Sequence, residues 1–442
     1  MAREAGMNAE ADNARLFVWF RVFFNCRFYY PVFTVLFLDL GLSIGEFAAL
    51  NVVWALTSVV LEVPSGALAD RFGRRPLVIT AAVLMVLEML VLVLMPAGRH
   101  DIVFALFIVN RVLSGAAEAC ASGADEALAY DSLPEQTREA EWPRVMARLS
   151  RAMALGFVIS SITGSLLYDH THLSAWVGIT LSKELCMKLP VLLCLGSAVA
   201  CLVITLRMRE AWHPPQNMPL LASMRETIAS ILRTGGWIWR TRAAFALILL
   251  GLVFDSMIRL FLTVASNYYR LVGIEEVWFG VIGTGVSLLG LFTASLMEKA
   301  TRRMSGVVNF TWLALVVLGG LFAAAYPMHG WLGIVLVVPL FMSMRFLQFF
   351  LSHYMNAVVT SEQRATALSF RGLSMNLAYG SITLLFGWHT GWLAHAKGLS
   401  PDDIHVFAAS MTWWPWWFAG TLVVAGLWVL ARRLPKPAIK NA

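Results

Sequence analysis

The stretch Gly66-Ala67-Leu68-Ala69-Asp70-Arg71-Phe72-Gly73-Arg74-Arg75-Pro76 is a short, strongly basic turn between two long apolar segments, 51–68 and 77–95. A helix that crosses a bilayer needs roughly 20 mainly apolar residues, and each flanking segment approaches that length. The turn between them is too short to be a domain. The stretch therefore predicts two membrane helices joined by a tight basic turn.

Composition places the whole chain in the same class. Of its 442 residues, 59% are hydrophobic and 14% are charged, whereas soluble proteins carry about 25% charged residues. Strand-like alternation is absent over the apolar segments, which argues against an outer-membrane barrel. We predict an all-α polytopic membrane protein with twelve transmembrane helices in two pseudo-symmetric six-helix bundles. The predicted spans are 17–40, 46–68, 76–96, 102–128, 152–168, 189–207, 243–267, 277–297, 306–326, 331–356, 368–393 and 405–431.

The formal net charge of +7 raises the question of a nucleic-acid partner, but the distribution of the basic residues argues against one. Lys and Arg concentrate in alternate connections, at 71–75, 138–151, 207–242, 299–303 and 432–440. By the positive-inside rule these connections are cytoplasmic, and an even number of helices then places both termini inside. We expect a monomeric, multi-pass inner-membrane protein whose surroundings are the lipid bilayer.

The cysteines give no sign of a metal or redox site. Four of the five lie inside predicted spans, Cys186 stands just before one, and none has a paired spacing. We interpret them as packing thiols and expect neither a metal nor a cofactor. The head, residues 1–16, lacks the basic-then-apolar order of a cleaved signal peptide, so the first span is expected to serve as an uncleaved insertion signal.

The interval 208–242 divides the chain. It opens with His213-Pro214-Pro215, which stops a helix, and continues with apolar residues at helical spacing and basic residues between them. An interfacial amphipathic helix on the inner leaflet fits that pattern, and a partly ordered linker is the alternative. We expect an N-terminal six-helix bundle over 1–207, a cytoplasmic linker over 208–242 and a C-terminal six-helix bundle over 243–442.

The basic turn has a counterpart in the second half of the chain. In the first turn an acidic residue lies four positions after Gly66 and two arginines lie eight and nine positions after it. In the second half, Glu298, Arg302 and Arg303 stand at the same distances from Ala294. Corresponding turns in two six-helix halves are typical of a duplicated transporter that binds its substrate between the halves.

Each residue type in the turn has a physical reason. Gly66 permits close helix packing, and Gly73 permits a sharp reversal. Asp70 lies at a helix carboxyl end, where the dipole disfavours a negative charge by about 0.3–1 kcal/mol, so a neighbouring arginine or another helix must offset it. A latch that forms in one conformation and opens in another fits, and a plain basic turn is the alternative. The predicted latch comprises Gly66, Asp70, Arg71, Gly73, Arg74 and Arg75, with Glu298, Arg302 and Arg303 as its degenerate counterpart.

The turn resembles the signature of the major facilitator superfamily, Gly-x-Leu-Ala-Asp-Arg-x-Gly-Arg-Arg, with nearly every position filled. Arg111-x-x-x-Gly115 resembles the family's second signature, which is associated with proton coupling there, and 122–131 is similar to a subset of bacterial drug and metabolite exporters. Exporters of the proton-antiport branch often carry Gly-Pro near the end of the fifth span, whereas 156–164 keeps glycines without the proline. The resemblance implies the superfamily fold, a small-molecule substrate and protons as the coupling ion.

Charged residues inside the predicted spans are candidates for the transport pathway, because a charge at the bilayer centre costs several kcal/mol unless it faces a cavity or a partner. In the fourth span Arg111, Gly115, Glu118, Ser122 and Asp125 recur at intervals of four and three, which predicts one helical face. A structural ion pair that only holds helices together is the alternative interpretation for each charge.

Four further intramembrane charges join this set. Asp255 and Arg259 are spaced to pair on one helix, Glu88 lies mid-span in the third helix without a partner there, and Arg27 lies in the first. The candidate proton-coupling and substrate-cavity residues are therefore Glu88, Arg111, Glu118, Asp255, Arg259 and Arg27.

The sequence as a whole predicts a secondary active transporter and not an enzyme. It would export a small organic molecule by alternating access against proton entry, with protonation of Glu118, Glu88 or Asp255 alternating with substrate binding. Proton-coupled uptake of an organic anion, and export of a lipid or siderophore, are the alternatives. Primary transport is disfavoured because no Walker-type phosphate-binding run occurs.

Overall fold

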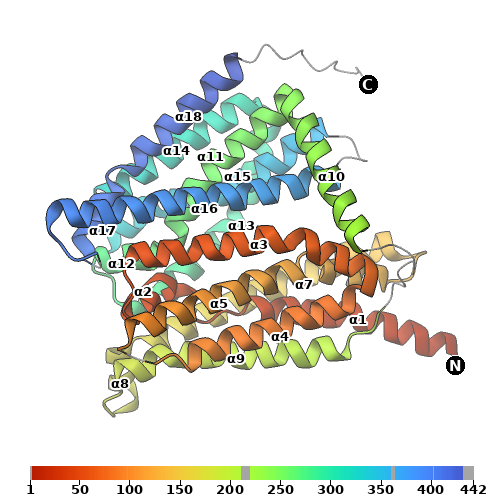
Figure 1. Cartoon of the computed structure of the whole chain (residues 1–442), viewed down its shortest axis with the longest axis horizontal. Helices are drawn as coiled ribbons and strands as arrows, with labels where there is room; N and C mark the ends of the chain where they lie inside the picture. The colour runs from red at the N-terminus through yellow and green to blue at the C-terminus, as the bar shows by residue number, and fades with distance from the viewer. Residues whose placement is uncertain (1, 97, 211–219, 360–363, 402, 432–442) are drawn as a thin grey trace. The chain divides into compact units, whose positions relative to one another are not determined.

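The computed structural model describes residues 2–96, 98–210, 220–359, 364–401 and 403–431, and every regular element in those ranges is helical (Figure 1). The predicted all-α architecture is confirmed. The elements are α1 Ala2–Asn25, η1 Tyr30–Val32, α2 Phe33–Asp39, α3 Ile44–Phe72, α4 Arg74–Val93, α5 His100–Ala121, α6 Ala124–Asp131, α7 Arg138–Tyr168, α8 His170–Val177, α9 Lys183–Arg207, α10 Leu220–Arg240, α11 Arg242–Thr263, α12 Ala265–Leu271, η2 Glu276–Trp278, α13 Phe279–Arg303, α14 Gly306–Ala325, α15 Trp331–Val358, α16 Arg364–Lys397, α17 Ile404–Met411 and α18 Trp414–Ala431.

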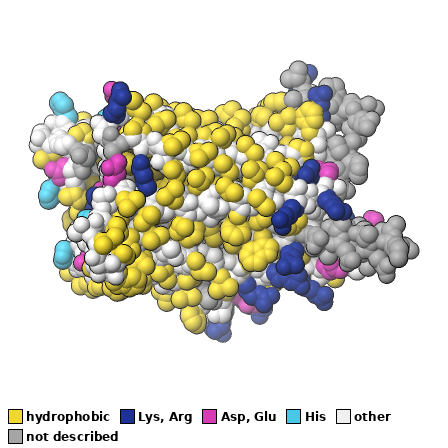
Figure 2. Space-filling model, turned by 90° about the horizontal axis from the view of Figure 1, so that it is seen from below, with side chains coloured by type: hydrophobic (Ala, Val, Ile, Leu, Met, Phe, Trp, Pro, Cys, Tyr) yellow, Lys and Arg dark blue, Asp and Glu magenta, His cyan; other side chains and the backbone are white. Residues whose placement is uncertain are grey.

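The helices of the described part include nine that are long and apolar enough to cross a membrane, and a bent pair over Glu276–Gly290 and Phe292–Arg303 makes a tenth. The remaining two predicted spans, 17–40 and 368–393, correspond to α1 with α2 and to α16. Figure 2 shows one face of the molecule covered by hydrophobic side chains, with Lys and Arg gathered toward one end. This distribution is that of a polytopic membrane protein.

Four predicted spans are interrupted rather than continuous: the first, the fourth, the seventh between α11 and α12, and the twelfth between α17 and α18. In the first, α1 ends at Asn25 and the chain passes through η1 before α2 begins. Pro31 in η1 has no N–H to continue a helix. In the fourth, α5 ends at Ala121 and α6 begins at Ala124, because Gly123 adopts a left-handed conformation with φ 74° that glycine favours.

Contacts divide the chain into two compact units. Unit 1 comprises residues 1–42, 53–227 and 275–284, and unit 2 comprises 43–52, 228–274 and 285–442. The start of α3 thus belongs to unit 2 and the start of α13 to unit 1. Helix α10 lies within the predicted linker and carries both apolar and basic residues at helical spacing.

Glycines set the helix contacts of unit 1, where α1 packs against α7 and α9, and α4 packs against α5 and α9. A Cβ at Gly115 of α5 would lie 2.9 Å from the Trp54 carbonyl of α3. A Cβ at Gly164 of α7 would collide with the Phe28 carbonyl, at the break after α1. Of the glycines noted in 156–164, Gly164 therefore lets α7 touch backbone and Gly156 lets it approach the side chains of α1, which is the common role of glycine in membrane helix packing.

A buried carboxylate joins α7, α8 and the segment before α13 in unit 1. Asp169 is 3% exposed and accepts hydrogen bonds from the Thr171 hydroxyl at 2.6 Å and from the N–H groups of His172 and Val277 at 3.1 and 3.2 Å. Burial alone would raise the pKa of the Asp169 carboxyl. These hydrogen bonds and the nearby His172 together lower the pKa by more than burial raises it, so the net pKa lies below its usual value.

Unit 2 is organised around α11, which packs against α15, α16 and α18, while α14 packs against α15 and α18. Aromatic rings fill these contacts: Phe254 of α11 meets Phe418 of α18 with ring centroids 5.2 Å apart, and Trp414 is fully buried. Edge-to-face arrangements of this kind add about 0.5–1.5 kcal/mol per pair beyond burial.

Candidate transport site and conformational latch

A cluster of buried charges lies within unit 1. Arg27 comes from the break after α1, Glu88 from α4 and Arg111 from α5, and each is at most 5% exposed. Arg27 Nη1 lies 2.8 Å from Glu88 Oε2, and Arg111 Nη2 lies 3.9 Å from Glu88 Oε1. Two guanidinium groups thus share one carboxylate, and the three residues carry a formal charge of +1.

Neighbouring groups hold this cluster in place. Asn110 donates to the Glu88 backbone carbonyl at 3.0 Å and accepts from the Arg111 guanidinium at 2.7 and 3.0 Å. The Arg111 guanidinium also lies over the rings of Phe33 and Phe37, at 5.5 and 5.2 Å from their centroids. Cation–π contacts of this kind stabilise a guanidinium that has lost its water.

Sequence reasoning selected Arg27, Glu88 and Arg111 separately, and the structure brings them together. The partner missing for Glu88 within its own helix is supplied by Arg27, 61 residues earlier. Asn110 was missed, although its position directly before Arg111 in an apolar segment is a usable signal.

The face predicted on the fourth span is continuous within α5, from Arg111 through Gly115 to Glu118, and is interrupted only after Ala121. Arg111 and Gly115 are buried, whereas Glu118 is exposed and the helix breaks after Ala121. Beyond the break, Asp125 is 1% exposed, and its Oδ2 lies 2.5 Å from Nε of Arg21 on α1. Glu118 therefore stays on the helix that carries Arg111, with its side chain exposed, and the break after Ala121 lies beyond it.

A second group of charges lies within unit 2. Asp255 is fully buried, and its Oδ2 lies 2.7 Å from Nη2 of Arg259, as the i,i+4 spacing predicts. Arg259 also donates to Asn376 Oδ1 of α16 at 2.8 Å, and Gln348 of α15 donates to Asp255 Oδ1 at 3.4 Å. Arg371 of α16 presents a buried Nη1 that has no hydrogen-bond partner within the described part of the chain. The pair thus ties α11 to α15 and α16, and sequence reasoning missed these partners because they lie on other helices.

The basic turn that joins α3 and α4 contacts other helices of unit 1. Gly73 adopts φ 93°, the left-handed region that permits the predicted sharp reversal. Arg74 pairs with Asp131 at the end of α6, and it also donates to the Ala127 carbonyl at 2.9 Å. The turn is therefore fixed to α6 by a charged contact.

Arg75 fixes the same turn to the end of α9. Its Nε donates to the Met208 carbonyl at 2.6 Å, and its backbone N–H donates to Glu210 Oε2 at 2.8 Å. The carboxylate of Glu210 thereby caps the amino end of α4, where a negative charge is favoured. Neither Asp131 nor Glu210 was identified from the sequence as a partner of the basic turn.

The other predicted latch residues differ from expectation. Gly66 is exposed and a Cβ there would have no neighbour within 4 Å, so the predicted close packing at Gly66 is wrong. The side chain of Asp70 lies outside the described residues, and Arg71 lies over the Phe72 ring at 5.3 Å. Of the counterpart latch, Glu298 pairs at 2.6 Å with Arg302 of its own helix, with both side chains more than half exposed, and Arg303 is exposed.

These features define a helical membrane protein with buried charges and a basic turn after its second predicted span. The sequence profile described as "Major Facilitator Superfamily" matches residues 16–380, and the chain belongs to that family. The resemblance inferred from the turn is thus confirmed. The family and its fold make this protein a secondary transporter of a small molecule.

Known proteins support the same fold. Over 136 residues the chain is 27% identical to the inner membrane transport protein YajR of Escherichia coli (strain K12), a match that covers 31% of this chain and only about a quarter, 26%, of that protein. A bacterial homologue of the human lysosomal transporter Spinster, in an inward-facing and unoccupied conformation, is similar over 97% of this chain and 99% of its own, with a TM-score of 0.70 at 16% identity.

A D-xylose–proton symporter is similar over 99% of both chains, with a TM-score of 0.63 at 14% identity. At such identities these likenesses establish the fold alone.

Proposed function

We propose that the protein exports a small organic molecule by alternating access against proton entry, with Glu88 as the coupling carboxylate. The observation that carries the proposal is the buried cluster in which Arg27 and Arg111 share Glu88. A buried charge in a membrane helix is costly and is usually retained for a transport function. In this cluster Glu88 can accept a proton, and the guanidinium groups of Arg27 and Arg111 are attracted to it only while it is charged.

The geometry suggests how protonation would act. Arg27 makes the close contact with Glu88, at 2.8 Å, while Glu88 Oε1 has no hydrogen-bond partner in the described part and faces Arg111 at 3.9 Å. A proton arriving on Oε1 would remove the charge that attracts Arg111. Arg111 would then be free to act on a substrate or on a neighbouring helix, so proton binding and substrate binding would alternate.

The direction of transport and the membrane location are proposed from a resemblance, a named relative and the basic connections. Residues 122–131 resemble a subset of exporters, and the curated relative is by name an inner membrane transport protein. The alternating basic connections support an inner-membrane location with cytoplasmic termini. We extend the proposal to a monomer whose two six-helix bundles, 1–207 and 243–442, are joined by 208–242, with α10 on the inner membrane surface.

Proton-coupled uptake of an organic anion is the second candidate. The net charge of +1 on Arg27, Glu88 and Arg111 favours it, because an uncompensated guanidinium attracts a carboxylate or phosphate. In unit 2, Arg259 is already occupied by Asp255 and Asn376. We therefore assign the Asp255–Arg259 pair a structural role that joins α11 to α16.

Transport in a defined system would test the proposal. Metabolites retained by a strain lacking the gene, compared with the complemented strain, would supply candidate substrates. Each would then be offered to proteoliposomes under an imposed pH gradient of either sign. Export against proton entry predicts that an opposing proton gradient drives accumulation and that Glu88→Gln abolishes this drive, whereas Glu118→Gln retains it. Substrate accumulation that does not depend on the pH gradient would refute the role of Glu88. Accumulation in Glu88→Gln with the same proton dependence as in the native protein would also refute it.

A further inference from the structure

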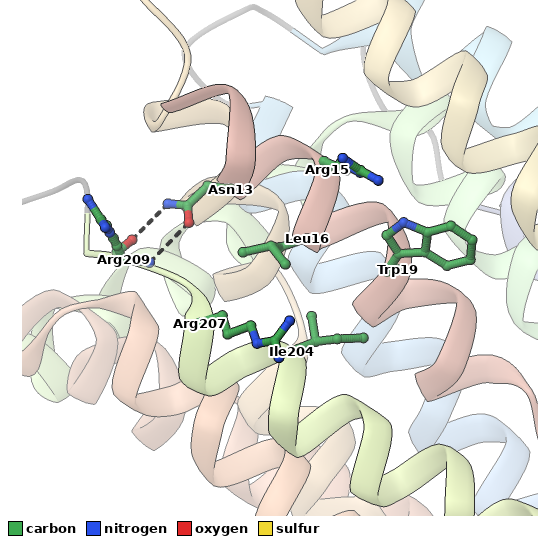
Figure 3. A pocket seen from close by; sticks show the side chains of 7 residues that line it. All are labelled: Asn13, Arg15, Leu16, Trp19, Ile204, Arg207 and Arg209. Carbon is green, nitrogen blue, oxygen red and sulfur yellow. Dashed lines mark hydrogen bonds between the residues drawn. The ribbon is translucent and has the colours of Figure 1, made fainter. Parts of the chain in front are cut away.

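A polar cavity of about 440 Å³ lies in unit 1 between the middle of α1 and the end of α9 (Figure 3). Its lining comprises Asn13, Arg15, Leu16, Trp19, Ile204, Arg207 and Arg209. Asn13 is 4% exposed, and its amide clamps the backbone of Arg209: Nδ2 donates to the carbonyl at 2.8 Å, and Oδ1 accepts from the N–H at 3.0 Å. This clamp fixes the chain leaving α9 beside α1.

The charge of the cavity is strongly positive. Three of its lining side chains are arginines, and its described lining contains no carboxylate. Arg15, Arg207 and Arg209 are exposed, so their guanidinium groups can adjust to an incoming anion. Figure 3 shows Arg207 reaching along the cavity toward Ile204, while Arg15 lies on the opposite rim. Guanidinium groups bind phosphate by paired, charge-assisted hydrogen bonds.

The remaining lining residues select an amphiphile over a soluble anion. Leu16 and Ile204 give an apolar wall, and Trp19 is 45% exposed beside them. Tryptophan concentrates at the level of lipid headgroups. Arg207 is the last residue of the membrane-spanning helix α9, so the arginines stand where a span meets the headgroup layer.

We propose that this cavity binds the phosphate of an anionic phospholipid, with the acyl chains leaving along Leu16, Trp19 and Ile204. The ligand chemistry is a phosphate diester attached to an apolar tail, and basic pockets between membrane helices are suited to it. The site lies next to the basic turn, because the Met208 carbonyl that accepts from Arg75 directly precedes Arg209. A bound lipid would therefore brace the end of α9 that the latch contacts.

Native mass spectrometry of the full-length protein would test the site. The protein is equilibrated with equimolar phosphatidylglycerol and phosphatidylcholine of identical acyl chains, and retained lipids are counted. A surface arginine contributes about 1 kcal/mol to anionic lipid binding, or roughly a fivefold change in affinity. We expect selective retention of phosphatidylglycerol, reduced at least about fivefold in Arg207→Gln and further in Arg15→Gln/Arg207→Gln.

Matched variants keep the test decisive. Arg144→Gln/Arg148→Gln removes two exposed arginines of α7 outside the cavity and should leave selectivity unchanged, and Arg207→Lys, which keeps the charge, should retain most of it. Equal loss in the α7 variant, or unchanged selectivity in Arg15→Gln/Arg207→Gln, would overturn the proposal. Inorganic phosphate forms the third arm: protection of the detergent-solubilised protein by phosphate, without selectivity for phosphatidylglycerol, would also overturn the lipid assignment.

Discussion

Replacing Glu88 with Gln is expected to destabilise the protein strongly, because it removes the one carboxylate that two buried guanidinium groups share. Glu88 is fully buried, and Arg27 and Arg111 are 5% and 4% exposed, so no solvent is available to replace the lost charge. The substitution preserves the size of the side chain. Its cost therefore reports electrostatics rather than a cavity.

The magnitude follows from the geometry. Two unit charges about 4 Å apart, as Arg111 and Glu88 are, interact by about 4 kcal/mol at an effective dielectric constant near 20. Part of this is offset because a neutral amide is cheaper to bury than a carboxylate, and the new amide oxygen can still accept from Arg27. Breaking a buried pair by removing one partner costs about 3–5 kcal/mol, and we expect the lower half of that range. An unfolding entropy of about 2.1 cal/mol/K per residue over 442 residues corresponds to about 1 °C per kcal/mol, so the apparent melting temperature should fall by roughly 4 °C.

The buried cysteines supply the assay. Cys26, Cys186, Cys194 and Cys201 are free and buried, so a maleimide fluorophore reacts with them only as the protein opens. Thermal unfolding in detergent is followed by this fluorescence for the native protein and for Glu88→Gln. Glu118→Gln is the matched control, because Glu118 is exposed on the helix that carries Arg111. A melting temperature within about 1 °C of the native value for Glu88→Gln, or an equal fall in Glu118→Gln, would contradict the reasoning.

Three further predictions concern other contacts of unit 1. Gly164→Ala should abolish the monodisperse peak in size-exclusion chromatography, because the new Cβ collides with backbone, whereas Gly196→Ala, where nothing lies within 4 Å, should keep it. Because the pKa of Asp169 is lowered, its carboxylate stabilises the fold above about pH 4, its unfolded value, and loses this as the pH falls through the lowered pKa. The stability difference between the native protein and Asp169→Asn should therefore shrink on acidification; a constant difference would refute it. Arg74→Gln and Asp131→Asn should each slow transport, and the double variant should be no slower than the worse single one; additive losses would contradict a shared contact.

The sequence predicted the fold well because membrane spans are a local property. The length of each apolar segment and the charge of each connecting loop can be read directly from the sequence. For this reason, ten of the twelve predicted spans coincide with candidate spans of the structure. The breaks at Pro31 and Gly123 were missed although the residues that cause them are visible. In an apolar segment, a Pro or Gly is compatible with either a kinked helix or an interrupted one, and tertiary contacts decide between them.

The candidate site was less accessible to sequence reasoning because its contacts are long-range. Each intramembrane charge was recognised from its position alone, but the pairing of Glu88 with Arg27 depends on how α4 packs near the end of α1. Local spacing predicted only the pair that lies on one helix, Asp255 with Arg259. It also placed Glu118 on one helical face with Arg111 and Gly115, which share α5, but it could not show that the Glu118 side chain is exposed.

The two basic turns show why a sequence echo does not guarantee equal roles. In the first, Arg74 pairs with Asp131 of α6, while at Arg75 the side chain donates to the Met208 carbonyl at the end of α9 and the backbone N–H donates to the Glu210 carboxylate. In the second, the acid Glu298 pairs with an arginine of its own helix, and both side chains are exposed. Exposed pairs of this kind contribute little. If a latch acts by joining separate elements, its function depends on where the partner carboxylate lies, and the first turn should therefore govern the conformational change even though both turns carry the same charges.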